Sequence, residues 1–195
     1  MSFLGGFGMD AATGKYKDKI ITIPNILSLF RFCLIPVIIW IYLGLENYIL
    51  AGFMILFSGF TDIVDGYIAR KFDMISDVGK VLDPIADKST QGVVVLLLAT
   101  KFPLIIVVAA LILIKEVFMA ISGYMVVKKC NIVLAAEWYG KLSTVIITAM
   151  MVLHLFWPEL NPILSNVSII ITALSVLMAL VLYAIRNFGY LNSVK

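Results

Sequence analysis

Long apolar segments separated by short polar turns constrain the fold of this chain more than any other feature. The chain has 195 residues, of which 62% are hydrophobic and only 14% are charged. A soluble globular domain carries about a quarter charged residues. A helix needs about 20 apolar residues to cross a bilayer. The chain is therefore predicted to be an all-α integral membrane protein, and its length allows a bundle of about six transmembrane helices.

Clusters of Gly, Pro and Asn between the apolar segments give the limits of the predicted helices. These helices cover residues 24–43, 48–70, 76–99, 104–127, 135–156 and 163–185. Residues 1–19 are too short and too interrupted to span a bilayer, and we expect an N-terminal arm or leader that is interfacial or disordered. Residues 20–195 are predicted to form a single domain.

Basic residues are distributed unequally between the two sets of turns. One set, together with the chain ends and nearby helix ends, carries Lys15, Lys17, Lys19, Arg70, Lys71, Lys80, Lys128, Lys129, Lys141, Arg186 and Lys195. The opposite set carries only Lys101, with Glu46 and Glu159. The positive-inside rule then predicts a multi-pass protein of the cell (cytoplasmic) membrane with both termini in the cytosol. This topology explains the net charge of +3, and no nucleic-acid signature is present.

Four carboxylates stand inside this apolar sequence, at Asp62, Asp65, Asp83 and Asp87. A bare carboxylate in an apolar setting is very costly. The first two are three residues apart and the last two are four apart, so each pair lies on one face of its helix. The short link near 72–75 forces the two helices to pack antiparallel, which allows the pairs to converge. A hard divalent cation is the simplest partner for them, and an active site facing the cytosol is predicted.

Small residues on the same faces, Gly66, Ala69 and Gly79, leave room for a ligand or allow close helix packing. The acids also have other interpretations: an ion-pair cluster, or the cation path of a divalent-cation transporter. A non-catalytic lipid-binding scaffold is a third class. Carboxylates that hold Mg²⁺ usually bind phosphate with it, and one acid left partly free can act as a general base. The residues therefore favour metal-dependent chemistry on a phosphorylated lipid.

The same residues resemble the signature of the CDP-alcohol phosphatidyltransferases, with every fixed position present. The matching pattern is Asp62-x2-Asp65-Gly66-x2-Ala69-Arg70-x8-Gly79-x3-Asp83-x3-Asp87. The resemblance extends to the six-helix layout and to an opening Pro24-Asn25-x2-Ser28-x2-Arg31.

The resemblance implies a reaction and a role for each residue. An acceptor hydroxyl attacks the β-phosphorus of CDP-diacylglycerol and CMP is released. The implied ligands of Mg²⁺ or Mn²⁺ are Asp62, Asp65, Asp83 and Asp87, with Asp83 and Asp87 catalytic and Asp87 the general base. The implied nucleotide and diphosphate site is formed by Asp62, Asp65, Gly66, Ala69, Arg70 and Gly79. Members of this family are commonly homodimers.

The acceptor needs cations of its own, because the four acids would repel a phosphate. The candidates are Arg31, Lys115, Lys141 and Arg186, although membrane anchoring explains Lys141 and Arg186 equally well. Lys115-Glu116 stands where members that use glycerol phosphate often have Arg-Glu. Residues 140–144 resemble their Gly-Lys-x-Lys-Thr, with Ser143 replacing the second lysine. Glycerol 3-phosphate, giving phosphatidylglycerol phosphate, is the predicted acceptor, and phosphatidylglycerol, as in cardiolipin synthases, is the alternative.

Two further residues are predicted to lie at the membrane interface. His154 falls near the outer end of the predicted helix 135–156, far from the acids, and is expected to be interfacial rather than catalytic. Glu137, near the start of the same predicted helix, is also expected to be interfacial.

Overall fold

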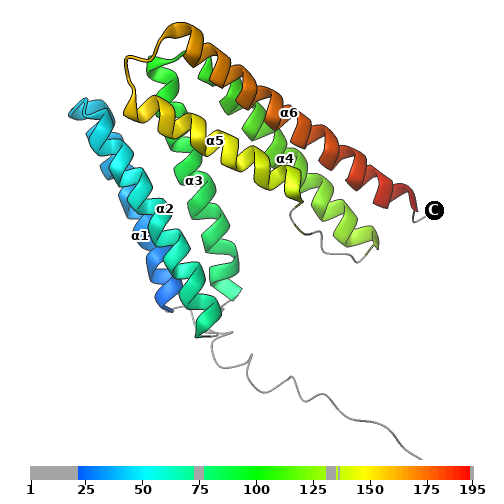
Figure 1. Cartoon of the computed structure of the whole chain (residues 1–195). Helices are drawn as coiled ribbons and strands as arrows, with labels where there is room; N and C mark the ends of the chain where they lie inside the picture. The colour runs from blue at the N-terminus through cyan, green and yellow to red at the C-terminus, as the bar shows by residue number, and fades with distance from the viewer. Residues whose placement is uncertain (1–21, 73–76, 131–134, 136, 194–195) are drawn as a thin grey trace, which may run out of the picture. The chain divides into compact units, whose positions relative to one another are not determined.

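The computed structural model describes residues 22–72, 77–130, 135 and 137–193, and these residues contain helices and no strand (Figure 1). The elements are α1 Ile23–Ile39, the π-helix η1 Trp40–Gly44, α2 Tyr48–Lys71, α3 Asp77–Lys101, α4 Ile105–Cys130, α5 Trp138–Phe156 and α6 Pro162–Ser193. The prediction of an all-α chain with six long helices is confirmed. The predicted arm, residues 1–19, lies outside the described residues.

Five of the six helices are long and apolar enough to cross a membrane, within the part of the chain that the structure describes. They are α1, α2, α4, α5 and α6. Helix α3, with 25 residues, is long enough to cross a membrane, but its first half is less apolar because it contains the predicted acids Asp83 and Asp87. The chain is thus a multi-pass membrane protein in which one helix combines a charged half with an apolar half.

The helices form two compact units, Met1–Val93 and Val94–Lys195. In the first unit, α1 begins at an N-cap, where the side chain of Thr22 accepts a hydrogen bond from the backbone N–H of Asn25 at 3.4 Å. Near its end α1 contains Pro36, which lacks an N–H for the helical ladder, and the chain continues as the wider turn η1. Asn47 then caps α2 by accepting from the backbone N–H of Leu50 at 3.0 Å.

Helices α1 and α2 pack against each other as an antiparallel pair, because only η1 and a short loop join them (Figure 1). The beginning of α1, the end of α2 and the beginning of α3 lie at the same end of this unit. The end of α2 and the beginning of α3 therefore lie near each other, but the close antiparallel packing of α2 on α3 expected from the short link is not among the described helix contacts, in which α2 packs on α1.

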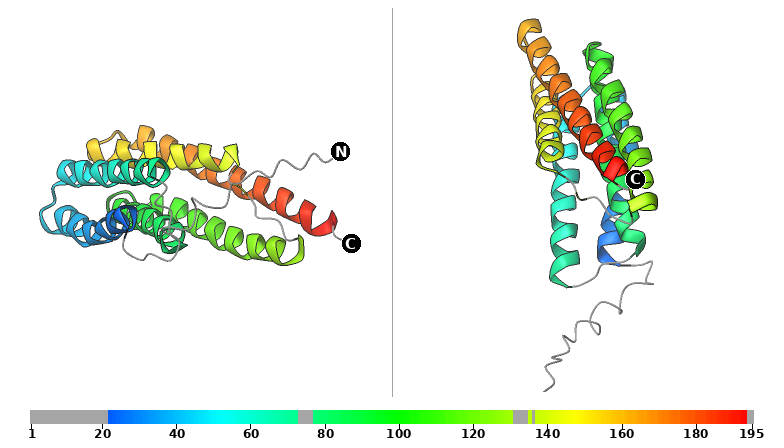
Figure 2. Two further views of the ribbon diagram at one scale, coloured as in Figure 1. Left: turned by 90° about the horizontal axis from the view of Figure 1, so that it is seen from below. Right: turned by 90° about the vertical axis from the view of Figure 1, so that its right-hand side faces the viewer.

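The second unit contains the end of α3 and helices α4, α5 and α6. Helix α6 packs on both α4 and α5. It has 32 residues against 19 in α5, so it continues well past the start of α5, along α4 (Figure 2). The buried side chains Tyr139, Ala179 and Tyr183 form a small core between α5 and α6, with Met119 of α4 against it.

Several predicted helix ends were wrong, and the physical reason differs between them. A break was predicted at 128–131, but α4 continues to Cys130. Lys128 and Lys129 belong to its last turn, where positive charges interact favourably with the helix dipole. Helix α5 begins at Trp138 rather than at 135. Pro162, predicted to belong to a turn, is the first residue of α6, a position that suits proline because its missing N–H has no helical partner there.

The end of α6 was also wrong, since the helix reaches Ser193 rather than 185. Arg186 therefore lies inside α6 and does not follow it. The extension is held by tertiary contacts: Asn187 is fully buried and donates to the hydroxyl of Ser122 on α4 at 2.7 Å. The rings of Phe118 and Phe188 lie 6.2 Å apart beside this bond.

Candidate active site

A row of polar side chains runs along one face of α1 in the first unit. Thr22, Asn25, Ser28 and Arg31 recur every three residues and are all buried. The other faces of α1 expose apolar side chains such as Ile26, Leu29 and Phe30. Residues three apart lie on neighbouring parts of a helix surface. Because Ser28 and Arg31 donate hydrogen bonds to Asp83 and Asp62, this buried part of α1 faces α2 and α3.

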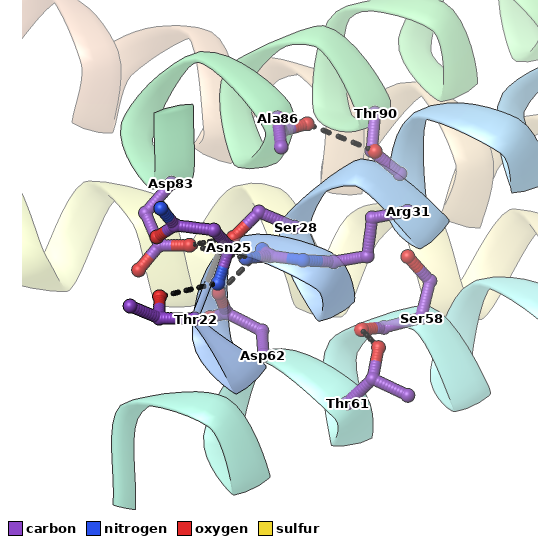
Figure 3. A network of polar contacts seen from close by, with 10 residues as sticks. All are labelled: Thr22, Asn25, Ser28, Arg31, Ser58, Thr61, Asp62, Asp83, Ala86 and Thr90. Atoms are coloured by element: carbon purple, nitrogen blue, oxygen red, sulfur yellow. Dashed lines mark hydrogen bonds and ion pairs between the residues drawn. The ribbon is translucent and has the colours of Figure 1, made fainter. Parts of the chain in front are cut away.

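Arg31 joins the carboxylates of α2 and α3 (Figure 3). Its Nη1 donates to Oδ1 of Asp62, and its Nη2 donates to Oδ1 of Asp83 at 2.9 Å. The Ser28 hydroxyl donates to the same Oδ1 of Asp83. Hydrogen bonds between charged partners are among the strong ones in proteins. One guanidinium thus brings together two acids that are 21 residues apart in the sequence.

The three charged groups differ in their exposure. The Arg31 side chain is 2% exposed, whereas those of Asp62 and Asp83 are 42% and 37% exposed. The guanidinium therefore lies behind the carboxylates, on the buried side, and the carboxylates lie where a ligand has access to them. The buried guanidinium offsets one of the two negative charges and so lowers the cost of holding both acids in an apolar setting.

The donor set that remains suits a hard cation. Both carboxylates receive their hydrogen bonds on Oδ1, and a carboxylate has a second oxygen that accepts equally well. Oxygen donors from carboxylates are the ligands that Mg²⁺ and Mn²⁺ prefer. Within the described residues, no group of three or more His, Cys, Asp or Glu side chains is placed to hold a metal ion. The described part of the site is thus a carboxylate pair rather than a complete ligand set.

The structure describes the other predicted site residues of α2 and α3 in part. Gly66 on α2 and Gly79 on α3 are partly buried, and Asp87 is exposed, one helical turn after Asp83. The side chains of Asp65, Ala69 and Arg70 lie outside the described residues. Thr90 follows on α3 and donates to the backbone carbonyl of Ala86 at 3.0 Å (Figure 3).

The predicted acceptor cations are distributed over both units. Arg31 is in the first unit, where it forms ion pairs with Asp62 and Asp83. In the second unit, Lys115 is buried in α4 with its Nζ 3.0 Å from Oε1 of Glu116. Lys141 is exposed in the first turn of α5. Arg186 on α6 donates from Nη1 to the Ala135 carbonyl at 3.0 Å and to Oε1 of Glu137 at 3.2 Å.

A tightly packed set of residues surrounds the start of α5. The guanidinium of Arg186 lies 4.9 Å from the ring centre of Tyr183, and the Tyr183 hydroxyl accepts from the backbone N–H of Glu137 at 3.3 Å. A Cβ on Gly140 would lie 2.9 Å from Cζ of Tyr183, which real Cβ atoms essentially never show. The glycine of the Gly140-Lys141 motif thus makes room for Tyr183, whose ring in turn supports Arg186.

Sequence reasoning gave no site role to three of these positions. Ser28 belongs to the opening pattern of α1, and its three-residue spacing from Arg31 is a signal that the two side chains share one part of the helix surface. Glu137 was predicted to be interfacial; it is the N-cap of α5 and the ion-pair partner of Arg186. No local signal identified Tyr183, which lies 43 residues after Gly140 in the sequence.

His154, predicted to be interfacial, is 1% exposed. Its Nδ1 hydrogen-bonds the Met150 carbonyl at 2.8 Å and its Nε2 hydrogen-bonds the Ser165 hydroxyl at 2.9 Å. The ring of Phe102 packs edge-on against it. Both ring nitrogens are satisfied within the second unit, so the residue joins α5 to α6 and is not part of the acid site.

Comparison with known proteins identifies relatives of this chain. Residues 21–184 match the model of the CDP-alcohol phosphatidyltransferase family. A CDP-diacylglycerol–glycerol-3-phosphate 3-phosphatidyltransferase of Aquifex aeolicus is 29% identical over 172 residues, which cover 85% of this chain and 96% of that protein.

Two relatives carry another name. A cardiolipin synthase (CMP-forming) / mitochondrial hydrolase fusion protein of Schizosaccharomyces pombe is 40% identical over 103 residues, 53% of this chain and 17% of that protein. A cardiolipin synthase (CMP-forming) of Streptomyces coelicolor is 38% identical over 81 residues, 39% of this chain and 38% of that protein. In both, the similarity covers less than half of the relative's length. Because the family match spans most of the residues and includes the helices that carry the acid pair, the chain belongs to the CDP-alcohol phosphatidyltransferase family.

Proposed function

We propose that this protein transfers a phosphatidyl group from CDP-diacylglycerol to an acceptor alcohol and releases CMP. The observation that carries the proposal is the acid pair, Asp62 and Asp83, which two helices bring to one guanidinium while leaving both carboxylates accessible. A cation transporter would need acids along a path through the membrane, whereas Asp62 in the second half of α2 and Asp83 in the first half of α3 meet at one guanidinium. Family membership supports an enzyme over a scaffold.

In the proposed reaction, Asp62, Asp65, Asp83 and Asp87 hold the divalent cation, for which Mg²⁺ or Mn²⁺ fits the oxygen donors. When bound, the cation neutralises the diphosphate and stabilises the charge that develops during displacement at phosphorus. Gly66, Ala69 and Gly79 leave space for the cytidine, and Arg70 binds the diphosphate.

The proton and the leaving group follow from the same assignment. Asp87 accepts the proton of the acceptor hydroxyl, and the hydroxyl oxygen forms a bond to the β-phosphorus. The phosphoanhydride bond breaks, and its electrons leave with CMP. The proton passes from Asp87 to water, which returns the carboxylate to its starting state.

We assign glycerol 3-phosphate as the acceptor, giving phosphatidylglycerol phosphate. A relative that the similarity covers over 96% of its length bears the name of that activity. Lys115, Lys141 and Arg186 are the proposed phosphate-binding cations of the second unit, and Arg31 is the fourth candidate that the sequence suggested. Exposed Lys141 lies in the first turn of α5, where the positive end of the helix dipole favours an anion.

Cardiolipin synthesis, with phosphatidylglycerol as acceptor, is the second candidate. The observation that favours it is Ser143, which is fully buried and donates to the Gly140 carbonyl at 3.0 Å. The position occupied by lysine in the glycerol-phosphate pattern thus points inward in this chain and supplies no cation. Two relatives named as cardiolipin synthases are consistent with this candidate.

The proposed setting is the cytoplasmic membrane, with both termini and the acid site on the cytosolic side. We also propose that the protein is a homodimer and that residues 20–195 act as one domain. These assignments follow from the distribution of basic residues and from the family.

The test is a panel of acceptors incubated with purified protein, CDP-diacylglycerol and Mg²⁺, with CMP release and lipid mass spectrometry as readouts. We expect phosphatidylglycerol phosphate from glycerol 3-phosphate, and losses of about 10²-fold or more in Asp83→Asn and Asp87→Asn. Glu159→Gln is the matched control, since Glu159 is exposed in the loop between α5 and α6. Product from phosphatidylglycerol alone would favour the second candidate, and undiminished CMP release in both Asp variants would refute the reaction class.

A further inference from the structure

Arg31, a candidate for binding the acceptor, makes its described charged contacts with the acid pair. Both terminal nitrogens of its guanidinium donate to carboxylates, one on α2 and one on α3. Its side chain is 2% exposed. A cation that is buried behind two acids, with both arms of its fork engaged, is poorly placed to bind the phosphate of an incoming acceptor.

We propose that Arg31 is the internal counter-ion of the acid pair. It positions Asp62 and Asp83, and it reduces the share of the protein's stability that depends on a divalent cation. The inference rests on the proposed function, in which these two aspartates are metal ligands. It makes Arg31 a positioning residue, which acts on the reaction through the two carboxylates.

The hydrogen-bond pattern explains how the guanidinium and a cation are able to share the same acids. Arg31 and Ser28 donate to Oδ1 atoms, so each carboxylate keeps Oδ2 as a further acceptor (Figure 3). The planar fork of arginine holds two acceptors in a fixed geometry, whereas lysine is a point charge on a flexible stem. Ser28, fully buried one turn before Arg31, adds a third fixed donor to this arrangement.

The charge balance gives the expected effect of removing Arg31. Two carboxylates and one guanidinium carry a formal charge of −1, and the two carboxylates alone carry −2. Like charges at close range disfavour each other's ionised form, and partial burial strengthens this effect. Without Arg31, neither of the described ion pairs of Asp62 and Asp83 would remain, and a bound divalent cation would carry a larger share of their neutralisation. The folded protein should then gain more stability from metal than the unaltered protein does.

The experiment uses the full chain, purified in detergent and stripped with EDTA. Unfolding is followed as Mn²⁺ is added, and Mn²⁺ binding is measured separately by electron paramagnetic resonance. In Arg31→Gln we expect a lower Tm without metal, and an Mn²⁺-induced rise in Tm that exceeds the wild-type rise by about 2 °C or more. Arg31→Lys keeps the charge but loses the fork, and it should fall between the two.

The matched control is Ser122→Ala, which removes a buried hydrogen bond in the second unit. It should lower the metal-free Tm and leave the Mn²⁺-induced rise unchanged, as any purely structural loss would. If Arg31→Gln behaves like Ser122→Ala, or keeps the wild-type Tm without metal, the inference is wrong. If Arg31→Gln folds only with Mn²⁺ the inference is supported, and if it does not fold at all, the rise measured for Arg31→Lys decides.

A different experimental result would refute the proposed function. Unchanged Mn²⁺ binding in Asp62→Asn and Asp83→Asn would show that the acid pair is not the metal site. The behaviour of Arg31→Gln in EDTA would still report separately on whether Arg31 neutralises the pair.

Discussion

The start of α5 depends on the size of one residue. Gly140 faces the ring of Tyr183, and that ring packs against both Tyr139 and the guanidinium of Arg186. Any side chain at position 140 would have to displace the ring. The geometry of Arg186, a candidate acceptor cation, is therefore set by a glycine on another helix.

Gly140→Ala should destabilise the protein by about 1–3 kcal/mol, the usual cost of overpacking a well-packed site. The measurement is the midpoint of unfolding in a denaturing detergent. Gly123→Ala is the control, because a Cβ there meets nothing within 4 Å. The control should be neutral or slightly stabilising, since alanine is the better helix former. Equal midpoints for the two variants would contradict the proposed role of Tyr183.

The sequence predicted which residues form the acid site but not which of them bind each other. Helical spacing placed Asp62 and Asp83 on converging faces, because periodicity is a property of the local sequence. The partner of Arg31 was not predictable in the same way. It depends on how α1 packs against α2 and α3, and a buried arginine in a membrane helix has no periodic signal that names its acids.

Polar contacts between helices stabilise the second unit, and the apolar sequence did not indicate where these contacts would form. Asn187 and Ser122 join α6 to α4, and His154 and Ser165 join α5 to α6. Each pair is buried on both sides. Because lipid and protein interior are equally apolar, such contacts and close packing take over part of the role that hydrophobic burial has in water.

Asn187→Ala should lower the free energy of unfolding by about 0.5–2 kcal/mol, because it leaves the Ser122 hydroxyl without this donor. The double variant with Ser122→Ala should cost less than the sum of the single changes, since both halves of one contact are then gone. Thr148→Ala is the control: Thr148 is exposed and bonds only the Thr144 carbonyl of its own helix in the described contacts. Additive effects of the two single changes would argue against a direct coupling of α4 and α6.

Helix ends were harder to predict than helices. The long apolar runs determined the number and type of elements, since only helices satisfy backbone groups inside a bilayer. The ends depended on contacts that local composition does not report. Lys128 and Lys129 looked like a break and extend α4, and the polar residues after 185 looked like a tail and extend α6 through Asn187.

At the scale of the whole molecule, the helices are confirmed and their orientation in the membrane stays a prediction. Basic residues gather in alternate turns, and the positive-inside rule converts this asymmetry into cytosolic termini. The loop between α5 and α6, which contains Glu159, is then outside the cytosol. The end of α4, which contains Lys129, is inside.

Cysteine labelling in bacterial cells tests this orientation. In a background with Cys33→Ser and Cys130→Ser, Glu159→Cys should react with a membrane-impermeant maleimide in intact cells. Lys129→Cys should react only after the cells are opened. Glu159 and Lys129 are both exposed in the structure, so a cysteine at either position that fails to react is shielded by the membrane and not by burial in the protein. The reverse pattern would invert the topology and move the acid site to the opposite side.

The polar row on α1 also bears on how the protein is made. α1 is the first of the described helices to emerge during synthesis, and it carries Arg31 before Asp62 or Asp83 exists. A lone arginine near the middle of a membrane helix costs about 2.5–3.5 kcal/mol at insertion, and lone aspartates carry a similar cost. We therefore expect α1 to remain beside the insertion machinery until α2 and α3 arrive, so that the three helices enter the lipid as one ion-paired group.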